Sequence, residues 1–78
     1  MTDIEKLMEK VLNTKGLISD RHLIKILKHY GYTKTFSKGS HTHFRKEGAI
    51  SFVVPIHNGK IKHFYVHDII NQIKEIYE

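Results

Sequence analysis

The stretch KGSHTHFR, residues 38–45, decides the fold, because it places a tight turn between two segments of β-favouring residues. Gly39 and Ser40 are typical turn residues. On either side of them, aromatic and β-branched side chains alternate with polar ones, which is the period of a strand. We therefore predict an antiparallel hairpin with strands at residues 32–38 and 41–46.

A third strand is predicted directly after this hairpin. Glu47 and Gly48 indicate a second turn, residues 49–56 are rich in β-favouring side chains, and Pro55 brings the strand to an end. Alternation then assigns the side chains to two faces. The face toward the rest of the protein is expected to carry Phe44, Ile50, Phe52 and Val54. The opposite face is expected to carry His41, His43, Arg45 and Ser51.

Apolar residues at helical spacing predict helices on both sides of the strands. These helices are expected at residues 3–14, 19–30 and about 65–77, with a loop at residues 57–60. The order is therefore an N-terminal helix followed by α-β-β-β-α. We predict an α+β fold with a three-stranded antiparallel sheet and the helices on one of its faces.

The chain has 78 residues, no cysteine and a formal net charge of +5. This length holds one hydrophobic core, so residues 1–78 are expected to form a single domain. The lack of cysteine excludes disulfides, thiolate zinc sites and cysteine nucleophiles. No apolar run approaches the ~18 residues of a membrane span, and residues 1–12 have no signal-peptide pattern. We therefore expect a cytoplasmic protein with no membrane contact.

The positive charge is concentrated in the middle of the chain. Residues 21–67 hold nine Lys and Arg side chains against Glu47 alone, a net charge of +8, together with all seven histidines. Both flanking segments are weakly acidic. A basic region of this kind is typical of proteins that bind a polyanion, and nucleic acid is the usual one.

The outward face of the predicted sheet carries His41, His43 and Arg45 in a His-x-His-x-Arg pattern. Histidine exchanges protons near neutral pH, and Arg45, Lys38 and the backbone amides of the adjacent turn suit a phosphate group. RNA supplies its own nucleophile, the 2′-hydroxyl, so a base and positive charge suffice for its cleavage. From the pattern alone, an ordinary polar sheet face explains these residues equally well.

A metal site is another interpretation of the histidines. His41 and His43 share a face, and His63 and His67 are four residues apart. Neither pair is accompanied by cysteine or by a cluster of carboxylates, which argues against zinc, and His63 is expected to precede the last helix. We therefore predict no metal and no cofactor.

Four runs in the same order resemble the HicA toxin family. They read LIKILKHYGY (residues 23–32), KGSHTHFR (38–45), VVPIH (53–57) and V-x-x-I-I-x-Q-I (66–73). The resemblance covers about residues 19–76 as a family core and leaves residues 1–16 as a helical extension, whose apolar stripe is expected to pack on the domain. Members of this family are small mRNA interferases of prokaryotic toxin–antitoxin pairs. Their fold is like that of double-stranded-RNA-binding domains (dsRBD-like).

This resemblance implies roles for particular residues. His41 is the histidine of the Gly-Ser-His motif and inherits the family's catalytic role, with Gly39 and Ser40 as the turn that presents it. Pro55 and His57 match a Pro-x-His motif whose role is structural or accessory. The resemblance also implies a protein partner, an antitoxin like HicB, which covers the active site.

The chain departs from the family pattern at two places. Thr42 stands where a second histidine is common, and Phe64-Tyr65 stands where the last helix usually starts with a small capping residue. Both departures leave Gly-Ser-His intact, so they bear on substrate preference more than on chemistry.

We interpret the chain as a toxin that cleaves mRNA as a metal-independent endoribonuclease. His41 is the expected general base or proton relay. The residues expected to contact RNA are Lys38, Gly39, Ser40, His43 and Arg45. Two alternatives stay open: a non-catalytic RNA-binding module of dsRBD-like fold, and a basic interaction protein that docks an acidic antitoxin.

Overall fold

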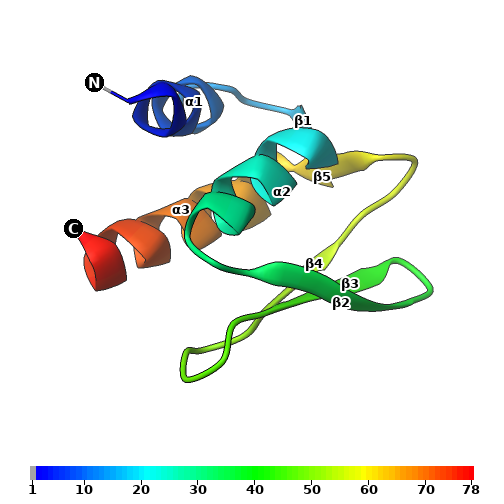
Figure 1. Ribbon diagram of the computed structural model, residues 1–78. Helices are drawn as coiled ribbons and strands as arrows, with labels where there is room; N and C mark the ends of the chain where they lie inside the picture. The colour runs from blue at the N-terminus through cyan, green and yellow to red at the C-terminus, as the bar shows by residue number, and fades with distance from the viewer. Residues whose placement is uncertain (1) are drawn as a thin grey trace.

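Helices and short strands follow one another in the computed structural model, which describes residues 2–78 and, for Phe36 and Ser37, the backbone alone (Figure 1). The helices are α1 (Asp3–Leu12), α2 (Asp20–His29) and α3 (His63–Tyr77). The strands are β1 (Leu17–Ser19), β2 (Thr33–Lys38), β3 (His41–Arg45), β4 (Phe52–Pro55) and β5 (Lys60–Lys62). The predicted α+β class is confirmed. Within the described part of the chain, no helix is long and apolar enough to cross a membrane.

The three-stranded antiparallel sheet that the sequence predicts is present, with the strand order β2-β3-β4. β3 is the central strand, and His41 at its start lies opposite Lys38 of β2 and Pro55 of β4. The register between β2 and β3 shifts between Lys34 and Phe36. Such a bulge bends a strand and increases its local twist.

Burial alternates along β3 as a strand with one covered face requires. Thr42 and Phe44 are buried, His41 and Arg45 are exposed, and His43 between them is half-buried. The predicted outward position of His41 and Arg45 is therefore confirmed.

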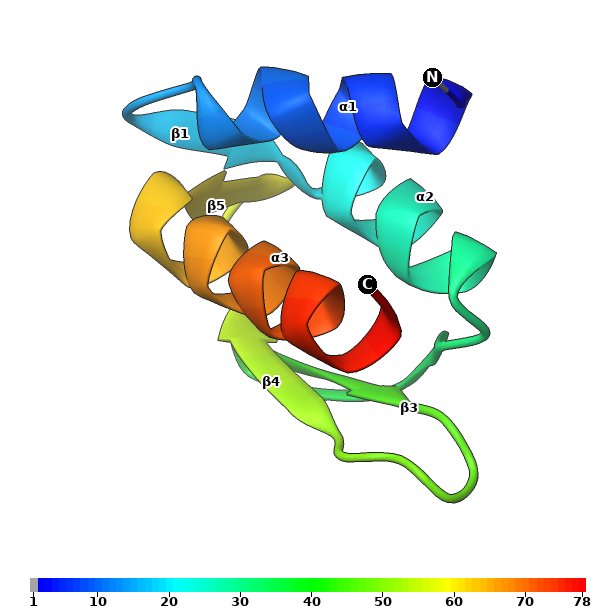
Figure 2. The same cartoon turned by 90° about the vertical axis from the view of Figure 1, so that its left-hand side faces the viewer.

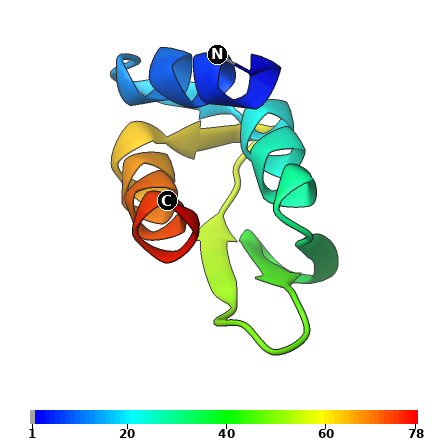
Figure 3. The same ribbon diagram turned by 60° about the vertical axis from the view of Figure 1, so that its left-hand side comes forward.

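The helices cover one face of this sheet in two layers. In Figures 1 and 3, α2 and α3 lie next to the sheet and α1 lies on their far side, where it packs against both. Figure 2 shows the same layers from another side, with α1 at the top and the sheet at the bottom. The buried side chains that fill the space between these layers include Met8, Val11, Leu23, Ile26, Leu27, Phe44, Val54, Val66, Ile70 and Ile73.

The N-terminal helix α1 belongs to this core. Thr2 caps the helix, because its hydroxyl oxygen accepts a hydrogen bond from the Glu5 backbone N–H at 3.1 Å. The helix ends at Leu12, shortly before the predicted end. Its buried residues, all on one stripe, are Ile4, Met8 and Val11. The expectation that the N-terminal extension packs on the rest of the protein is therefore confirmed.

The two-stranded antiparallel sheet of β1 and β5 was not predicted, because the segment before β5 was interpreted as a loop. In the structure, Asn58 and Gly59 have φ angles of 53° and 74°. His57 and Lys60 exchange both backbone hydrogen bonds across them, at 3.0 and 2.9 Å. Positive φ at both central residues marks a type I′ turn, for which Asn-Gly is the favoured sequence. This turn sends the chain into β5, where it pairs with β1.

The third strand is shorter than predicted, and the inward position predicted for Ile50 is wrong. β4 begins at Phe52, and the preceding residues form a turn in which the Ala49 N–H donates to the Lys46 carbonyl oxygen at 3.1 Å. Ile50 lies outside the strand, so the alternation that buries Phe52 does not extend to it. Its side chain is 51% exposed.

The last helix begins two residues earlier than predicted, at His63. Lys62 is extended and ends β5 at the N-cap position, and the His63 N–H donates to the Gly16 carbonyl oxygen at 2.8 Å. Ser19 has the predicted N-cap position of α2, but its side chain makes no capping hydrogen bond with the described residues.

Aromatic residues fasten the end of α3 to the end of α2. The rings of Tyr30 and Tyr77 stack with their centroids 5.1 Å apart, and the Lys46 Nζ donates to the Tyr77 hydroxyl at 3.0 Å.

The hydrogen bond from Lys46 lowers the pKa of Tyr77. Burial raises the pKa of Tyr32 to about 12, and the nearby Tyr77 hydroxyl adds to that rise. Tyr32 is therefore neutral throughout the physiological pH range.

Candidate active site

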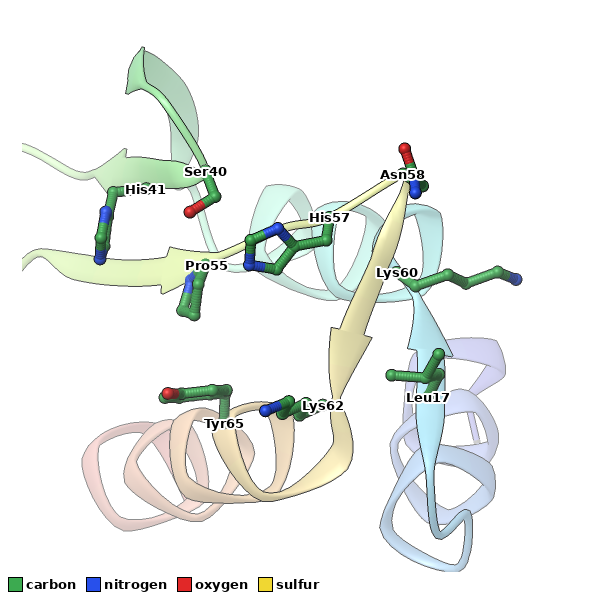
Figure 4. A pocket seen from close by; sticks show the side chains of 9 residues that line it. All are labelled: Leu17, Ser40, His41, Pro55, His57, Asn58, Lys60, Lys62 and Tyr65. Carbon is green, nitrogen blue, oxygen red and sulfur yellow. The ribbon is translucent and has the colours of Figure 1, made fainter.

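A pocket of about 520 Å³ opens where the three-stranded sheet meets the start of α3 (Figure 4). Its walls come from β1, from the turn before β3, from the end of β4 and the turn after it, and from the junction of β5 with α3. The lining residues are Leu17, Ser40, His41, Pro55, His57, Asn58, Lys60, Lys62 and Tyr65. Small-ligand pockets occupy about 300–1,000 Å³, so this pocket is large enough to be a binding site.

His41 lies at this pocket as the first residue of β3. Gly39 has φ +60°, a backbone conformation that glycine adopts without strain, so the chain reverses just before Ser40. The Ser40 carbonyl oxygen accepts a hydrogen bond from the Ile56 N–H at 2.7 Å, which continues the pairing with β4 into the turn. His41 thus stands on backbone that is paired on both sides, while its side chain is exposed.

The other walls of the pocket carry a second imidazole and two lysines. His57 and Lys60 flank the turn after β4, and Lys62 ends β5. Figure 4 shows the His57 ring pointing toward Pro55, whereas Lys60 extends away from it. Among the described residues that line the pocket, none is acidic. The pocket is therefore suited to an anion.

Only some of the predicted RNA-contacting residues gather at this pocket. Ser40 and His41 line it, and Lys38 and Gly39 directly precede them in the chain. His43 is half-buried further along β3, and Arg45 is exposed at the far end of the strand. At ~3.3 Å per residue, Arg45 lies about 13 Å from His41 along the strand, outside the pocket lining.

Sequence reasoning missed most of the remaining lining residues. It noted His57 through the Pro-x-His motif and Tyr65 only as a departure from the family pattern. It gave no role at the site to Leu17, Lys60 or Lys62. The Asn-Gly pair at residues 58–59 is typical of a type I′ turn and predicts a hairpin here. Such a hairpin would place Lys60 and Lys62 on the same side as Pro55. No local signal points to Leu17, because a strand of three residues is too short to show a period.

The second histidine pair binds backbone groups. The rings of His63 and His67 lie 5.2 Å apart. His63 Nδ1 accepts a hydrogen bond from the Gly16 N–H at 2.9 Å, and His67 Nε2 donates to the Val11 carbonyl oxygen at 2.8 Å. In the part of the chain that the structure describes, no group of three or more His, Asp or Glu side chains is placed to hold a metal ion. This pair joins α3 to the end of α1.

The molecule is thus a small basic α+β protein with an accessible histidine beside a cationic pocket. The family model described as "HicA toxin of bacterial toxin-antitoxin" matches residues 21–74, more than half of the 78-residue chain. The chain therefore belongs to the HicA toxin family, and its role is that of the toxin in a toxin–antitoxin pair. The match confirms the resemblance drawn from the sequence. The matched residues do not include α1 or β1. No curated protein and no solved structure matches the chain.

Proposed function

We propose that this toxin is a cytoplasmic endoribonuclease that cleaves mRNA without a metal ion, with His41 as its general base. The observation that carries the proposal is the position of His41. Its side chain is exposed, its backbone is paired on both sides, and it lines a pocket together with His57 and Lys62. The resemblance to the family supports this role, because His41 is the histidine of the Gly-Ser-His motif. A positioned base in a cationic site is the arrangement that RNA cleavage needs.

The substrate itself provides the nucleophile. His41 removes the proton of a 2′-hydroxyl, the 2′-oxygen forms a bond to the adjacent phosphorus, and the bond from phosphorus to the 5′-oxygen breaks. The products are a 2′,3′-cyclic phosphate end and a 5′-hydroxyl end, and the leaving 5′-oxygen takes up a proton. His57 is the second imidazole that lines the pocket and is our candidate for the proton donor.

Phosphate groups along the RNA would be held by the turn before His41 and by the strand after it. Lys38 and the backbone amides of Gly39 and Ser40 adjoin His41 and suit the phosphate that reacts. His43 and Arg45 continue along β3 and suit a neighbouring phosphate. In this proposal the family core of residues 19–76 and the extension of residues 1–16 act as one HicA-like domain.

Incubation of the purified protein with single-stranded RNA tests the function against its alternatives. Cleavage supports the proposal. Salt-sensitive binding without cleavage favours a non-catalytic RNA-binding module, and neither binding nor cleavage favours a protein that only docks its antitoxin through the basic surface. The antitoxin itself is proposed to be HicB-like and to cover the pocket, so that adding it should stop cleavage.

Cleavage is expected to continue in excess EDTA, because the proposed mechanism uses side chains and charge alone. The measurement is the initial rate on one RNA with and without the chelator. Complete loss of the rate in EDTA, restored by zinc or magnesium, would replace this mechanism with a metal-dependent one.

The affinity for RNA is expected to fall steeply as salt rises, because residues 21–67 carry a net charge of +8. Each phosphate contact to a single strand contributes about −0.7 to the slope of log K against log salt, through release of counterions. Binding titrations between about 50 and 200 mM salt measure this slope. An affinity that does not change over this range contradicts the electrostatic interpretation.

A further inference from the structure

The pocket beside His41 also has an apolar part that acid–base chemistry does not use. Leu17 and Tyr65 line it with 62% and 37% of their surfaces exposed, and Pro55 adds a third apolar side chain. Figure 4 shows the Tyr65 ring nearly edge-on, with one of its faces turned toward Pro55. An aromatic face within a cationic groove is the arrangement by which proteins hold unpaired nucleotides, because the face stacks on a base while the cations hold phosphates.

We infer that this pocket is a nucleobase subsite, into which an unpaired base next to the cleaved phosphate enters and stacks on Tyr65. The inference rests on the proposed function, because it needs RNA as the substrate. Ser40 offers a hydroxyl to the edge of the base, and Lys62 offers a cation to a phosphate that flanks it.

The shape and charge of the pocket favour an unpaired base over other occupants. Proteins recognise duplex RNA through its backbone and grooves, whereas a concave pocket of about 520 Å³ encloses one splayed nucleotide. Lys62 lies between Tyr65 and Leu17 beside the apolar part (Figure 4), and its positive charge complements a polyanion better than it complements an apolar protein segment.

The short strand β1, which follows the N-terminal extension, contributes one wall of this subsite. Leu17 lies in β1, before the matched residues 21–74, and it reaches the pocket because β1 pairs with β5 and places it opposite Lys62. The hydrogen bond from the Gly16 N–H to His63 Nδ1, at 2.9 Å, holds the chain next to Leu17 against the start of α3. Selection of the base is therefore a property of β1 and the family-matched residues 21–74 together.

The test pairs a change in the protein with a change in the RNA. The probe is a single-stranded oligoribonucleotide that the protein cleaves, made non-cleavable by a 2′-deoxy residue at the cleaved position. In a series of such probes, each carries one abasic residue at a different position next to the cleaved one. The protein variants are Tyr65→Ala and Tyr65→Phe, with Phe64→Ala as the matched control, because Phe64 is 52% exposed and lies outside the pocket lining.

One abasic position is expected to lower the affinity of the unchanged protein by about 5- to 150-fold, the range for loss of one base–aromatic stack. Tyr65→Ala should lower the affinity for the intact probe by a similar factor and should be insensitive to the abasic residue at that same position. Tyr65→Phe and Phe64→Ala should bind as the unchanged protein does. Leu17→Ala should alter which base is preferred at that position.

Three results overturn the inference. In the first, no abasic position lowers the affinity of the unchanged protein. In the second, the fold-losses in affinity from Tyr65→Ala and from the abasic residue multiply, which means that the two changes act independently. Alternatively, Tyr65→Ala weakens antitoxin binding and leaves RNA affinity unchanged, which makes the pocket a protein contact. In each case normal cleavage leaves the proposed function standing. If the unchanged protein neither binds nor cleaves single-stranded RNA, the proposed function fails and the subsite fails with it.

Discussion

His41→Ala is expected to lower the rate of RNA cleavage by about 10²–10⁴-fold, the range for loss of a general base. The residues proposed to hold phosphate remain in place, so RNA affinity should change much less than the rate. Toxicity on expression should be relieved, because the proposed function makes cleavage its cause. The fold should survive, since His41 is exposed at the start of β3 and truncation of such a residue costs within ~0.5 kcal/mol.

Two other histidines provide comparisons, one as a matched control and one with a smaller expected effect. His29 is exposed on α2, within the same basic region but outside the pocket lining, so His29→Ala should cleave as the unchanged protein does. His43 lies on β3 with His41 but outside the family's catalytic position. His43→Ala should therefore cause a milder loss, seen more in binding than in rate. Initial cleavage rates and thermal midpoints for all three variants make the comparison.

Either of two results would contradict this assignment. Normal cleavage by His41→Ala means that another group removes the proton, and His57→Ala is then the next variant to measure. A large fall in the thermal midpoint of His41→Ala means that the side chain supports the fold, against its exposed position.

The parts of the fold that follow from local signals could be predicted. Gly39-Ser40 combines turn residues with alternation on both sides, so the hairpin of β2 and β3 and the outward position of His41 follow from the chain itself. The predicted third strand was too long, because it assumed that the alternation of β4 also applies to the turn residues before Phe52. Ile50 is exposed there, in a segment whose backbone hydrogen bonds are local.

The parts that depend on pairing between distant short segments could not be predicted. β1 and β5 have three residues each and lie about 40 residues apart in the sequence, and segments this short carry no reliable period. Their pairing brings Leu17 and Lys62 to the pocket. The candidate base could thus be named from a motif, whereas the rest of the pocket could be found only once the chain was folded.

Met8 provides the largest effect that we expect on stability. Its side chain is 1% exposed in the core, and its sulfur lies 3.7 Å from the Tyr30 hydroxyl, so it joins α1 to the end of α2. Met→Ala in a core costs about 2–5 kcal/mol, through lost burial and the cavity left behind. A chain of this length has a total stability of only about 4–12 kcal/mol.

Met8→Ala is therefore expected to lower the thermal midpoint by about 10 °C or more, at 4–8 °C per kcal/mol for a domain of this size. Lys6→Ala is the matched control, because Lys6 is exposed on the same helix and its loss should change the midpoint little. Thermal unfolding of both variants, followed by far-ultraviolet circular dichroism, measures the difference. If Met8→Ala unfolds at the same temperature as Lys6→Ala, α1 does not share the core. The extension would then be a separate appendage that does not help to hold β1 beside the pocket.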